Sequence, residues 1–358
     1  MKNSKNILHY LFGKGSIKNL KTILKEYKNA DNYVIYYIDE YFKNNNLIKN
    51  LPIEDNDEIF YVETKNEPKT QYINKYRDIL KEKKKNTPQA IIAIGGGITL
   101  DTGKAVANLL TNEGNAEDYQ GWDLVKNPGI YKIGIPTLSG TGAEASRTCV
   151  MTNEKSGLKL GMNSDFTLFD QLILDPDLTK TVPREQYFYT GMDTYLHCIE
   201  SLNGEFRNAI GDAFSHQAIA LCREVFLSEN MMSDENREKL MVASYLGGCA
   251  IANSFVGIVH PFSAGLSVVL NTHHCIGNCI TMNGMEEFYP KEFEEFNLMA
   301  SKQDITIPKG IAANLNEDKY KALYNSTIIH EKPLSNALGD KFKNILTLEK
   351  VTDIFKRM

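Results

Sequence analysis

Four side chains of the chain could together hold one divalent metal ion. Asp193 and His197 are four residues apart in a stretch with helical spacing (GMDTYLHCIE), so both side chains project from one helix face. His260 and His274 follow, and His273, next to His274, would point in a different direction. One carboxylate with three imidazoles suits Zn²⁺ or Fe²⁺. The spacing equally fits histidines buried in an ordinary apolar core, so the residues alone leave both interpretations open.

A glycine triplet could bind the phosphates of a cofactor. Gly95, Gly96 and Gly97 follow a short apolar run and precede a helical pattern, so a phosphate could approach the backbone and the helix N-terminus. A second polar loop, residues 136–142 (PTLSGTG), also follows a strand pattern and adds hydroxyl groups. Each stretch alone could be a simple turn, but together they favour a dinucleotide site.

One carboxylate bears on which dinucleotide would bind. Asp39 ends the first clear strand pattern, where it could accept hydrogen bonds from an adenosine ribose and would repel a 2′-phosphate. Asp39 therefore favours NAD over NADP, although an aspartate that simply ends a strand would look the same.

The first half of the chain alternates strand and helix patterns. The predicted strands are Asn32–Ile38, Ala90–Ile94 and Lys132–Ile135, and the predicted helices are Thr70–Lys85 and Asp101–Leu110. A strand, glycine turn, helix and strand in this order are typical of a parallel βαβ sheet.

The second half has a different pattern. Residues 207–228 and 234–254 are long and periodic, Ser233 is placed to cap the second of them, and few strand signals remain. We therefore predict an α/β, Rossmann-like dinucleotide-binding domain over residues 1–180. Residues 181–358 should form an all-α metal-binding domain.

Composition narrows the class of protein further. The chain has 358 residues and a net charge of -5, which gives no nucleic-acid footprint. We expect no signal peptide, no transmembrane span and no membrane partner. Six scattered cysteines without a CxxC pair predict reduced thiols and a cytoplasmic location.

Several motifs in a fixed order resemble the iron-containing, or group III, alcohol dehydrogenase family. The resemblance runs from about Phe12 to about residue 285. It rests on residues 95–104 (GGGITLDTGK), 136–146 (PTLSGTGAEAS), 175–183 (DPDLTKTVP), 191–201 (GMDTYLHCIES) and 257–274 (GIVH…NTHH). It implies a dehydroquinate synthase-like architecture, a divalent metal and a nicotinamide cofactor.

The resemblance also implies roles for individual residues. The metal ligands would be Asp193, His197, His260 and His274. The cofactor-binding residues would be Gly95, Gly96, Gly97, Asp101, Lys104, Thr137, Leu138, Thr141 and, near the nicotinamide ribose, Lys159. In such an enzyme the metal lowers the pKa of the bound alcohol, and hydride passes to the nicotinamide.

The chain also departs from the family pattern. Ala264 stands where typical members have a second histidine in the alcohol pocket, Cys275 follows the last ligand where glycine is usual, and Ile98 replaces a serine. The metal set is intact, but the pocket for small alcohols and its proton relay are in doubt. The relay could be His273, a ribose hydroxyl or water.

Within the family the chain resembles a branch associated with oxidation of the C8 hydroxyl of 3-deoxy-D-manno-octulosonate (Kdo). That reaction would lie on the route to an 8-amino sugar of lipopolysaccharide. The expected partner is therefore a small sugar acid or alcohol, and the expected assembly is a homodimer.

Three other functions remain possible from the sequence. A dehydroquinate synthase-like lyase would use NAD and a metal without net NADH formation. A metal oxidase would pass electrons from the same sugar to O₂. A non-catalytic binding protein would keep the fold without chemistry. The Asp193 and His197 pair argues against the lyase, whose ligands are usually a glutamate and two histidines.

Overall fold

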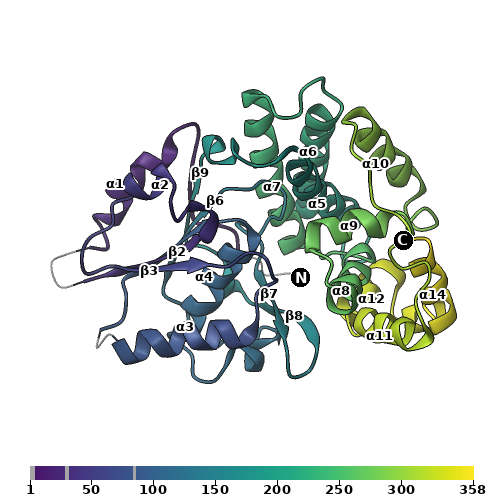
Figure 1. Cartoon of the computed structure of the whole chain (residues 1–358), viewed down its shortest axis with the longest axis horizontal. Coiled ribbons are helices and arrows are strands. Elements are labelled where there is room, and N and C mark those ends of the chain that lie inside the picture. Colours follow the sequence, from purple (N-terminus) through teal and green to yellow (C-terminus); the bar gives the residue numbers. More distant parts are fainter. Residues whose placement is uncertain (1–4, 29–31, 84–85) are drawn as a thin grey trace. The chain divides into compact units, whose positions relative to one another are not determined.

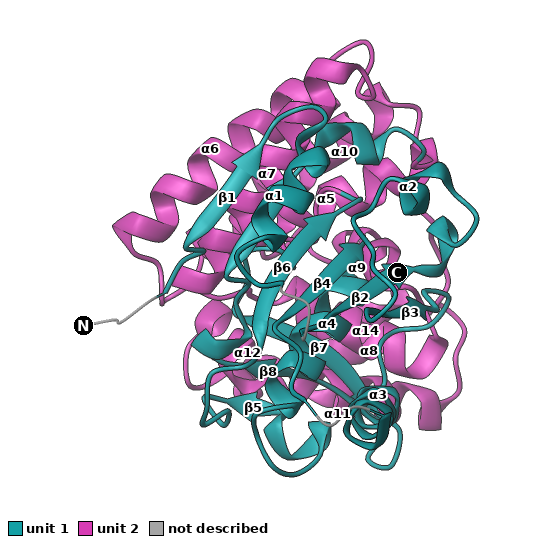
Figure 2. Ribbon diagram, turned by 90° about the vertical axis from the view of Figure 1, so that its left-hand side faces the viewer, with its two compact units in different colours: residues 1–138, 143–181 teal, residues 139–142, 182–358 magenta. Residues whose placement is uncertain are grey.

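The computed structural model describes residues 5–28, 32–83 and 86–358. The chain divides into two compact units (Figure 2). Unit 1 comprises residues 1–138 and 143–181, and unit 2 comprises residues 139–142 and 182–358. A search of the described helices for one long and apolar enough to cross a membrane finds none.

Unit 1 is built on a six-stranded sheet (Figure 1). In spatial order its strands are β1 (His9–Phe12), β9 (Gln171–Leu174), β6 (Tyr131–Pro136), β4 (Ala90–Gly95), β2 (Val34–Asp39) and β3 (Glu58–Val62). All neighbouring strands are parallel. Every residue of β4 is buried, as expected for a parallel strand covered on both faces. The predicted parallel sheet is confirmed.

The connection pattern of this sheet reverses direction between two strands. From β2 the chain moves outward to β3, then returns to β4 on the other side of β2 and continues outward to β6. In open parallel sheets such a reversal leaves a crevice at the carboxyl ends of the two central strands, and ligands bind there. Asp39 ends β2 and Gly95 ends β4, so both predicted cofactor residues lie at this point.

The helices of unit 1 are α1 (Leu20–Leu24), α2 (Asn46–Lys49), α3 (Thr70–Lys83) and α4 (Gly97–Leu109). The predicted end of the third helix at Lys85 lies outside the described residues. The prediction that α4 starts at Asp101 is wrong, because Gly96 is its N-cap and Gly97 its first residue. The glycine triplet therefore forms the helix N-terminus itself.

Unit 1 also contains a second, smaller sheet, which the sequence patterns did not predict. It contains β5 (Gly121–Trp122), β8 (Leu158–Asn163) and β7 (Thr148–Asn153), in that order. β7 and β8 form an antiparallel hairpin with full register from Thr148 and Asn163 to Asn153 and Leu158.

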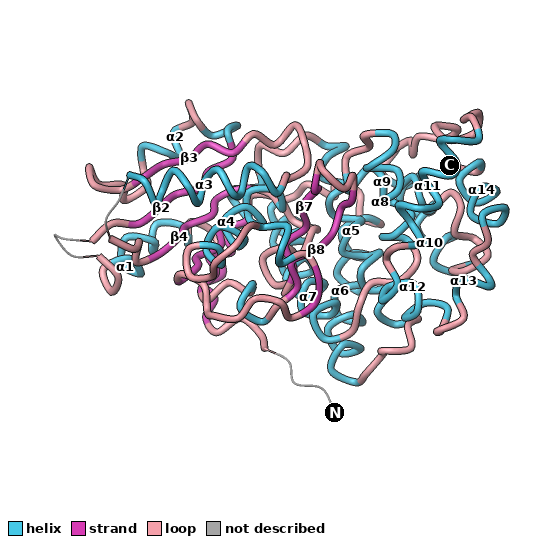
Figure 3. Tube along the Cα trace, turned by 90° about the horizontal axis from the view of Figure 1, so that it is seen from below, coloured by secondary structure: helices cyan, strands magenta, loops and turns pink. Residues whose placement is uncertain are grey.

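Unit 2 contains helices only (Figure 3). They are α5 (Arg184–Leu202), α6 (Ala209–Phe226), α7 (Asp234–Asn253), α8 (Val259–Leu270), α9 (His274–Met282), α10 (Pro290–Lys302), α11 (Glu317–Ile328), α12 (Glu331–Leu338), α13 (Phe342–Ile345) and α14 (Leu348–Lys356). The hydroxyl of Ser233 accepts a hydrogen bond from the backbone N–H of Asn236, which confirms the predicted cap of α7.

α5 is the central helix of unit 2. Residues 187–201 are all buried, and the helix packs against α6, α7 and α9. A helix that is buried all round needs no amphipathic pattern, and polar side chains on it must find partners inside the protein. Asp193 and His197 lie in this buried stretch.

All six cysteines are buried and none forms a disulfide. Burial raises the pKa of Cys198 to about 12 and those of Cys222 and Cys279 well above their ordinary value. For Cys198 this lowers the thiolate fraction at neutral pH roughly 10³-fold. We expect a thiol-specific chromogenic reagent to react very slowly with the native protein and with all six cysteines after denaturation. Rapid labelling of the native protein would contradict the buried packing.

Candidate metal and cofactor sites

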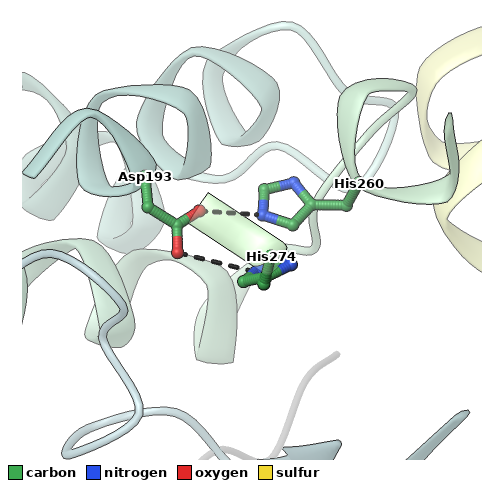
Figure 4. A group of neighbouring side chains, drawn as sticks. All are labelled: Asp193, His260 and His274. Carbon is green, nitrogen blue, oxygen red and sulfur yellow. Dashed lines mark hydrogen bonds and ion pairs between the residues drawn. The ribbon is translucent and has the colours of Figure 1, made fainter. Parts of the chain in front are cut away.

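Three helices of unit 2 bring together three potential metal ligands (Figure 4). Asp193 comes from α5, His260 from the first turn of α8 and His274 from the start of α9. The Nε2 of His260 lies 3.3 Å from Asp193 Oδ1, and the Nε2 of His274 lies 3.6 Å from Asp193 Oδ2. Two ligands of one tetrahedral ion with bonds of about 2.1 Å are about 3.4 Å apart. The donor atoms thus already have the spacing of ligands on a single ion.

His197, the fourth predicted ligand, lies beside this group. Its Nε2 is 3.6 Å from Asp193 Oδ1, and its ring stacks on that of His260 with centroids 4.7 Å apart. It is not among the donor atoms that all lie within 4.8 Å of one another, which are those of Asp193, His260 and His274. Its role as a ligand stays a prediction.

Glu200 supports the site from behind, and the sequence analysis missed it. Its Oε2 accepts a hydrogen bond from Nδ1 of His260, and its Oε1 accepts one from the backbone N–H of Val259 at 2.6 Å. An ionised carboxylate only accepts, so Nδ1 must carry a proton, and when the ring is neutral, as in a metal ligand, Nε2 has a lone pair facing Asp193. Its spacing in the sequence could have indicated this role, because Glu200 follows Asp193 by seven residues and so lies two turns along the same helix face.

The charge of the site fits a divalent cation. Asp193 and Glu200 are both fully buried, and neither forms an ion pair with a lysine or arginine of the described chain. Two buried carboxylates without a compensating charge would be strongly destabilising. A bound M²⁺ ion would balance them while neutral imidazoles supply the remaining ligands, as Zn²⁺ and Fe²⁺ sites commonly have.

Without a metal, the imidazoles carry part of this compensation. Burial would raise the pKa of Asp193, but His197, His274 and His260 together hold it below its ordinary value. Burial would lower the pKa of His260, but Glu200 and Asp193 raise it to about 10. Burial lowers the pKa of His197 to about 4. The neighbouring carboxylates therefore attract positive charge to the ring of His260.

A second group of predicted residues meets at the carboxyl edge of the unit 1 sheet. The backbone N–H of Thr137 donates to the carbonyl of Gly95 at 3.0 Å. A Cβ on Gly96 would lie 2.6 Å from the Leu138 side chain, and one on Gly95 would lie 3.0 Å from Cβ of Asp39. The loop, the triplet and Asp39 are therefore neighbours, and glycine is required for this close approach.

Two other predicted cofactor residues have partners inside unit 1. The Asp101 carboxylate accepts from the backbone N–H of Val150 on β7 at 2.9 Å. Lys104 is fully buried, and its Nζ donates to the carbonyls of Ala143, Ser146 and Thr148 and pairs with Asp101 at 3.1 Å. These contacts hold the segment after β6 onto α4. Direct contact of Asp101 or Lys104 with a cofactor stays a prediction.

The remaining predicted residues lie elsewhere. Lys159 is on β8, and its Nζ lies 3.2 Å from the Glu67 carboxylate. Thr141 belongs to unit 2. His273 is the N-cap of α9, and its ring Nδ1 is buried without a hydrogen-bond partner among the described residues. Ala264 lies one turn after His260 on α8. Their roles toward cofactor and proton stay predictions.

The loop segment 139–142 is held tightly by α5, which carries Asp193, and by α7. The hydroxyl of Thr194 donates to the carbonyl of Gly140 at 2.7 Å, and the hydroxyl of Ser244 accepts from the N–H of Gly140 at 2.7 Å. Gly140 has a φ of +141°, and a Cβ there would lie 1.6 Å from the carbonyl oxygen of Thr190. Only glycine fits this position.

We expect Gly140→Ala to destabilise the protein by more than about 3 kcal/mol, because the clash is with helix backbone that cannot move aside. The free energy of unfolding in urea measures this. Gly157→Ala is the matched control: Gly157 also has positive φ (+69°), but its added Cβ would meet nothing within 4 Å. Gly157→Ala should lower the free energy of unfolding by about 1 kcal/mol. Equal effects would contradict the close packing at Gly140.

Comparison with known proteins assigns the family. A model described as iron-containing alcohol dehydrogenase matches residues 8–176. A second model, for the C-terminal part of the Fe-containing alcohol dehydrogenase family, matches residues 187–325. The chain belongs to the iron-containing alcohol dehydrogenase family. The family resemblance and the predicted fold, an α/β domain followed by an all-α, dehydroquinate synthase-like domain, are thereby confirmed.

Individual relatives within this family are more distant. The sulfoacetaldehyde reductase of Bilophila wadsworthia is 36% identical over 218 residues, which are 60% of this chain and 55% of the relative. The NAD-dependent methanol dehydrogenase of Bacillus methanolicus is 28% identical over 277 residues, which are 76% and 72% of the two chains. The chain thus matches about half of the first relative's length and under three quarters of the second's.

Solved structures of the family share the fold over the whole chain. The structure of sulfoacetaldehyde reductase from Bifidobacterium kashiwanohense in complex with NAD⁺ has a TM-score of 0.81 at 20% identity, covering 99% of this chain and 98% of that one. The family is iron-containing, this neighbour binds NAD⁺, and the chain has a possible Asp/His/His metal site. The predicted cofactors, a divalent metal and NAD, agree with all three.

Proposed function

We propose that this chain is an NAD-dependent alcohol dehydrogenase that holds one divalent metal ion at Asp193, His197, His260 and His274. The observation that carries the proposal is the convergence of Asp193, His260 and His274 from three helices onto one point of unit 2. Membership of the iron-containing alcohol dehydrogenase family supports it. The reversal point of the sheet, with Asp39 and the glycine triplet, supports NAD as the hydride acceptor.

The residues around the metal and cofactor sites would have different roles in the reaction. When bound, the metal supplies a Lewis acid that favours the deprotonated alcohol. Glu200 keeps the proton of His260 at Nδ1, so that Nε2 faces the ligand cluster. Asp39, whose carboxylate already accepts from the N–H of Tyr41, offers its remaining lone pairs to ribose hydroxyls. His273 is the proposed group for carrying the alcohol proton away.

For the substrate we propose a sugar acid, with the C8 hydroxyl of Kdo as the specific candidate. Ala264 supports this, because alanine in place of the usual pocket histidine leaves room for a larger polyol. A second candidate is a small anionic aldehyde, since one relative is a sulfoacetaldehyde reductase. Arg147 does not support either substrate, because its guanidinium is paired with Asp123 and with Asp165 at 3.0 Å.

We also propose a cytoplasmic homodimer. Six buried cysteines without a disulfide support a reducing compartment. For the dimer, β1 is an edge strand of the described sheet; Tyr10 and Phe12 on it, and Leu8 just before it, are exposed apolar side chains at alternate positions. Such an edge is a template for pairing with a second copy, and two-fold assemblies are the commonest. Light scattering on the eluting protein would give twice the chain mass if this is right.

The function is tested by supplying metal-loaded protein with NAD and a panel of Kdo, methanol and 1,3-propanediol, and with NADH and sulfoacetaldehyde. We expect NADH to form with Kdo, or to be consumed with sulfoacetaldehyde if the second candidate is right. Peroxide formation without NAD would identify an oxidase instead. Substrate loss without net NADH would identify a lyase.

A further inference from the structure

Asn278 contacts one side-chain atom of each of Asp193, His260 and His274, the three potential metal ligands. It is fully buried on α9, one turn after His274, so both side chains lie on the same face. Its amide nitrogen lies 2.6 Å from Asp193 Oδ1, 3.4 Å from His260 Nε2 and 3.4 Å from His274 Nε2.

These contacts have one chemical meaning. To bind a metal, His260 and His274 must be neutral with their Nε2 lone pairs free, and together with the Asp193 oxygen these are three buried acceptors that repel one another unless a donor or cation lies among them. An amide NH₂ has two hydrogens, so Asn278 can bond the carboxylate with one and the imidazoles with the other. The Asn278 side chain therefore supplies donors to these acceptors when the imidazoles are neutral and ready to receive a metal.

The amide oxygen of Asn278 indicates the orientation of the side chain. Its Oδ1 is buried without a hydrogen-bond partner among the described residues. Reversing the amide would place this oxygen against the Asp193 carboxylate, which would be repulsive. The cluster thus fixes the amide orientation at the expense of leaving Oδ1 unsatisfied, and this indicates that the contact with the ligand atoms dominates.

The same helix also contacts the second oxygen of Asp193. The thiol of Cys275 donates to Asp193 Oδ2 at 3.8 Å, while Asn278 donates to Oδ1. α9 therefore contacts both carboxylate oxygens and also carries His274. A carboxylate held from both sides has lost its rotational freedom before a metal arrives, so less ordering remains to oppose binding.

We propose that Asn278 is a positioning residue of the metal site: its amide keeps Asp193, His260 and His274 converged and so sets the affinity for the metal. The inference rests on the metal site of the proposed function but not on its substrate or its hydride chemistry. Loss of a hydrogen-bond partner of a metal ligand typically lowers metal affinity about 10–100-fold.

The test measures metal binding by the full-length chain rather than turnover. Metal-stripped wild type, Asn278→Leu and Thr281→Val would compete with a chromogenic chelator for Zn²⁺ and, without oxygen, for Fe²⁺. Leucine keeps the volume of Asn278 and removes its donors. Thr281 is the control: it lies on the same helix, is fully buried, and has a hydroxyl without a partner in the described chain. We expect affinity about 10–100-fold weaker for Asn278→Leu and unchanged for Thr281→Val.

A second variant keeps the test decisive if Asn278→Leu does not fold. Asn278→Asp places a carboxylate beside that of Asp193, so the metal-free form should have a lower Tm, and added metal should raise its Tm by more than in wild type. Wild-type affinity in Asn278→Leu, or a metal-induced Tm shift in Asn278→Asp no larger than that of wild type, would overturn the inference. If wild type itself binds no divalent metal, the proposed function fails with it.

Discussion

Replacing Asp193 by asparagine is expected to abolish metal binding and to lower turnover by on the order of 10³-fold. The substitution keeps the shape of the side chain and removes the carboxylate that, in the described part of the chain, lies within 4 Å of His197, His260 and His274 alike. Losing the metal forfeits several kcal/mol of transition-state stabilisation, and about 4 kcal/mol corresponds to this factor. Metal content after gel filtration and initial rates of NADH formation measure the two effects.

Asp212→Asn is the control for this experiment. Asp212 is in the same unit and pairs with Arg207 on the surface, where an ion pair contributes at most about 1 kcal/mol. The control should keep full metal content and activity. A metal-loaded, active Asp193→Asn protein would show that the metal site, and with it the proposed function, has been placed wrongly.

The second large effect is expected at Glu200. Glu200→Gln leaves one oxygen to accept from the N–H of Val259 but turns an NH₂ group toward Nδ1 of His260, or the reverse. In either orientation two hydrogen-bond donors face each other inside the protein, which should lower the free energy of unfolding by about 1–3 kcal/mol. Because His260 then loses its fixed tautomer, metal affinity should fall about 10–100-fold. Chelator competition and urea unfolding of the metal-free protein measure these separately.

Glu295→Gln provides a matched comparison for this prediction. Glu295 on α10 is partly buried and accepts from Tyr195 at 2.6 Å and from Arg223 at 3.0 Å, but none of its hydrogen bonds in the described chain is with Asp193, His260 or His274. The Glu295→Gln variant should therefore have a lower free energy of unfolding but the metal affinity of wild type. If both variants kept wild-type affinity, Glu200 would be a cap of α8 and nothing more.

Sequence patterns located the elements of both units because local rules decide them. The apolar run of β4 predicts a strand buried on both faces, and Ser233 predicts the start of α7, since a single side chain caps that helix. The start of α4 was misplaced by four residues. Asp101 has the residue type of a cap, but the glycines continue into the helix, and no local preference distinguishes the two.

The supporting residues of the site could not be predicted in the same way. Glu200 and Asn278 act on groups that are distant in the sequence, 60 residues away for His260 and 85 for Asp193. A buried glutamate or asparagine on a helix looks like any other polar residue until tertiary packing shows what it contacts. Likewise, Lys104 fits a phosphate-binding lysine in sequence, while the structure shows its ammonium surrounded by three carbonyls.

The small sheet illustrates a third limit. Its hairpin strands, β7 and β8, mix buried and half-buried residues without a regular alternation, over only six positions each. The strand pattern of such short stretches is weaker than the turn pattern of the neighbouring glycine-rich loop, so it does not predict strands. Segment 139–142 was likewise assigned to the first domain, because nothing local shows that Gly140 packs against α5.

We propose that one divalent ion at Asp193, His260 and His274 supports NAD-linked oxidation of an alcohol. The most direct measurement is a titration of metal-stripped protein with Fe²⁺ or Zn²⁺, in which bound metal and the rate of NADH formation are followed in the same sample with the best substrate of the panel. We expect the rate to rise in proportion to bound metal and to level off at one ion per chain. NADH formation by the metal-free protein, or a rate that ignores the bound metal, would contradict it.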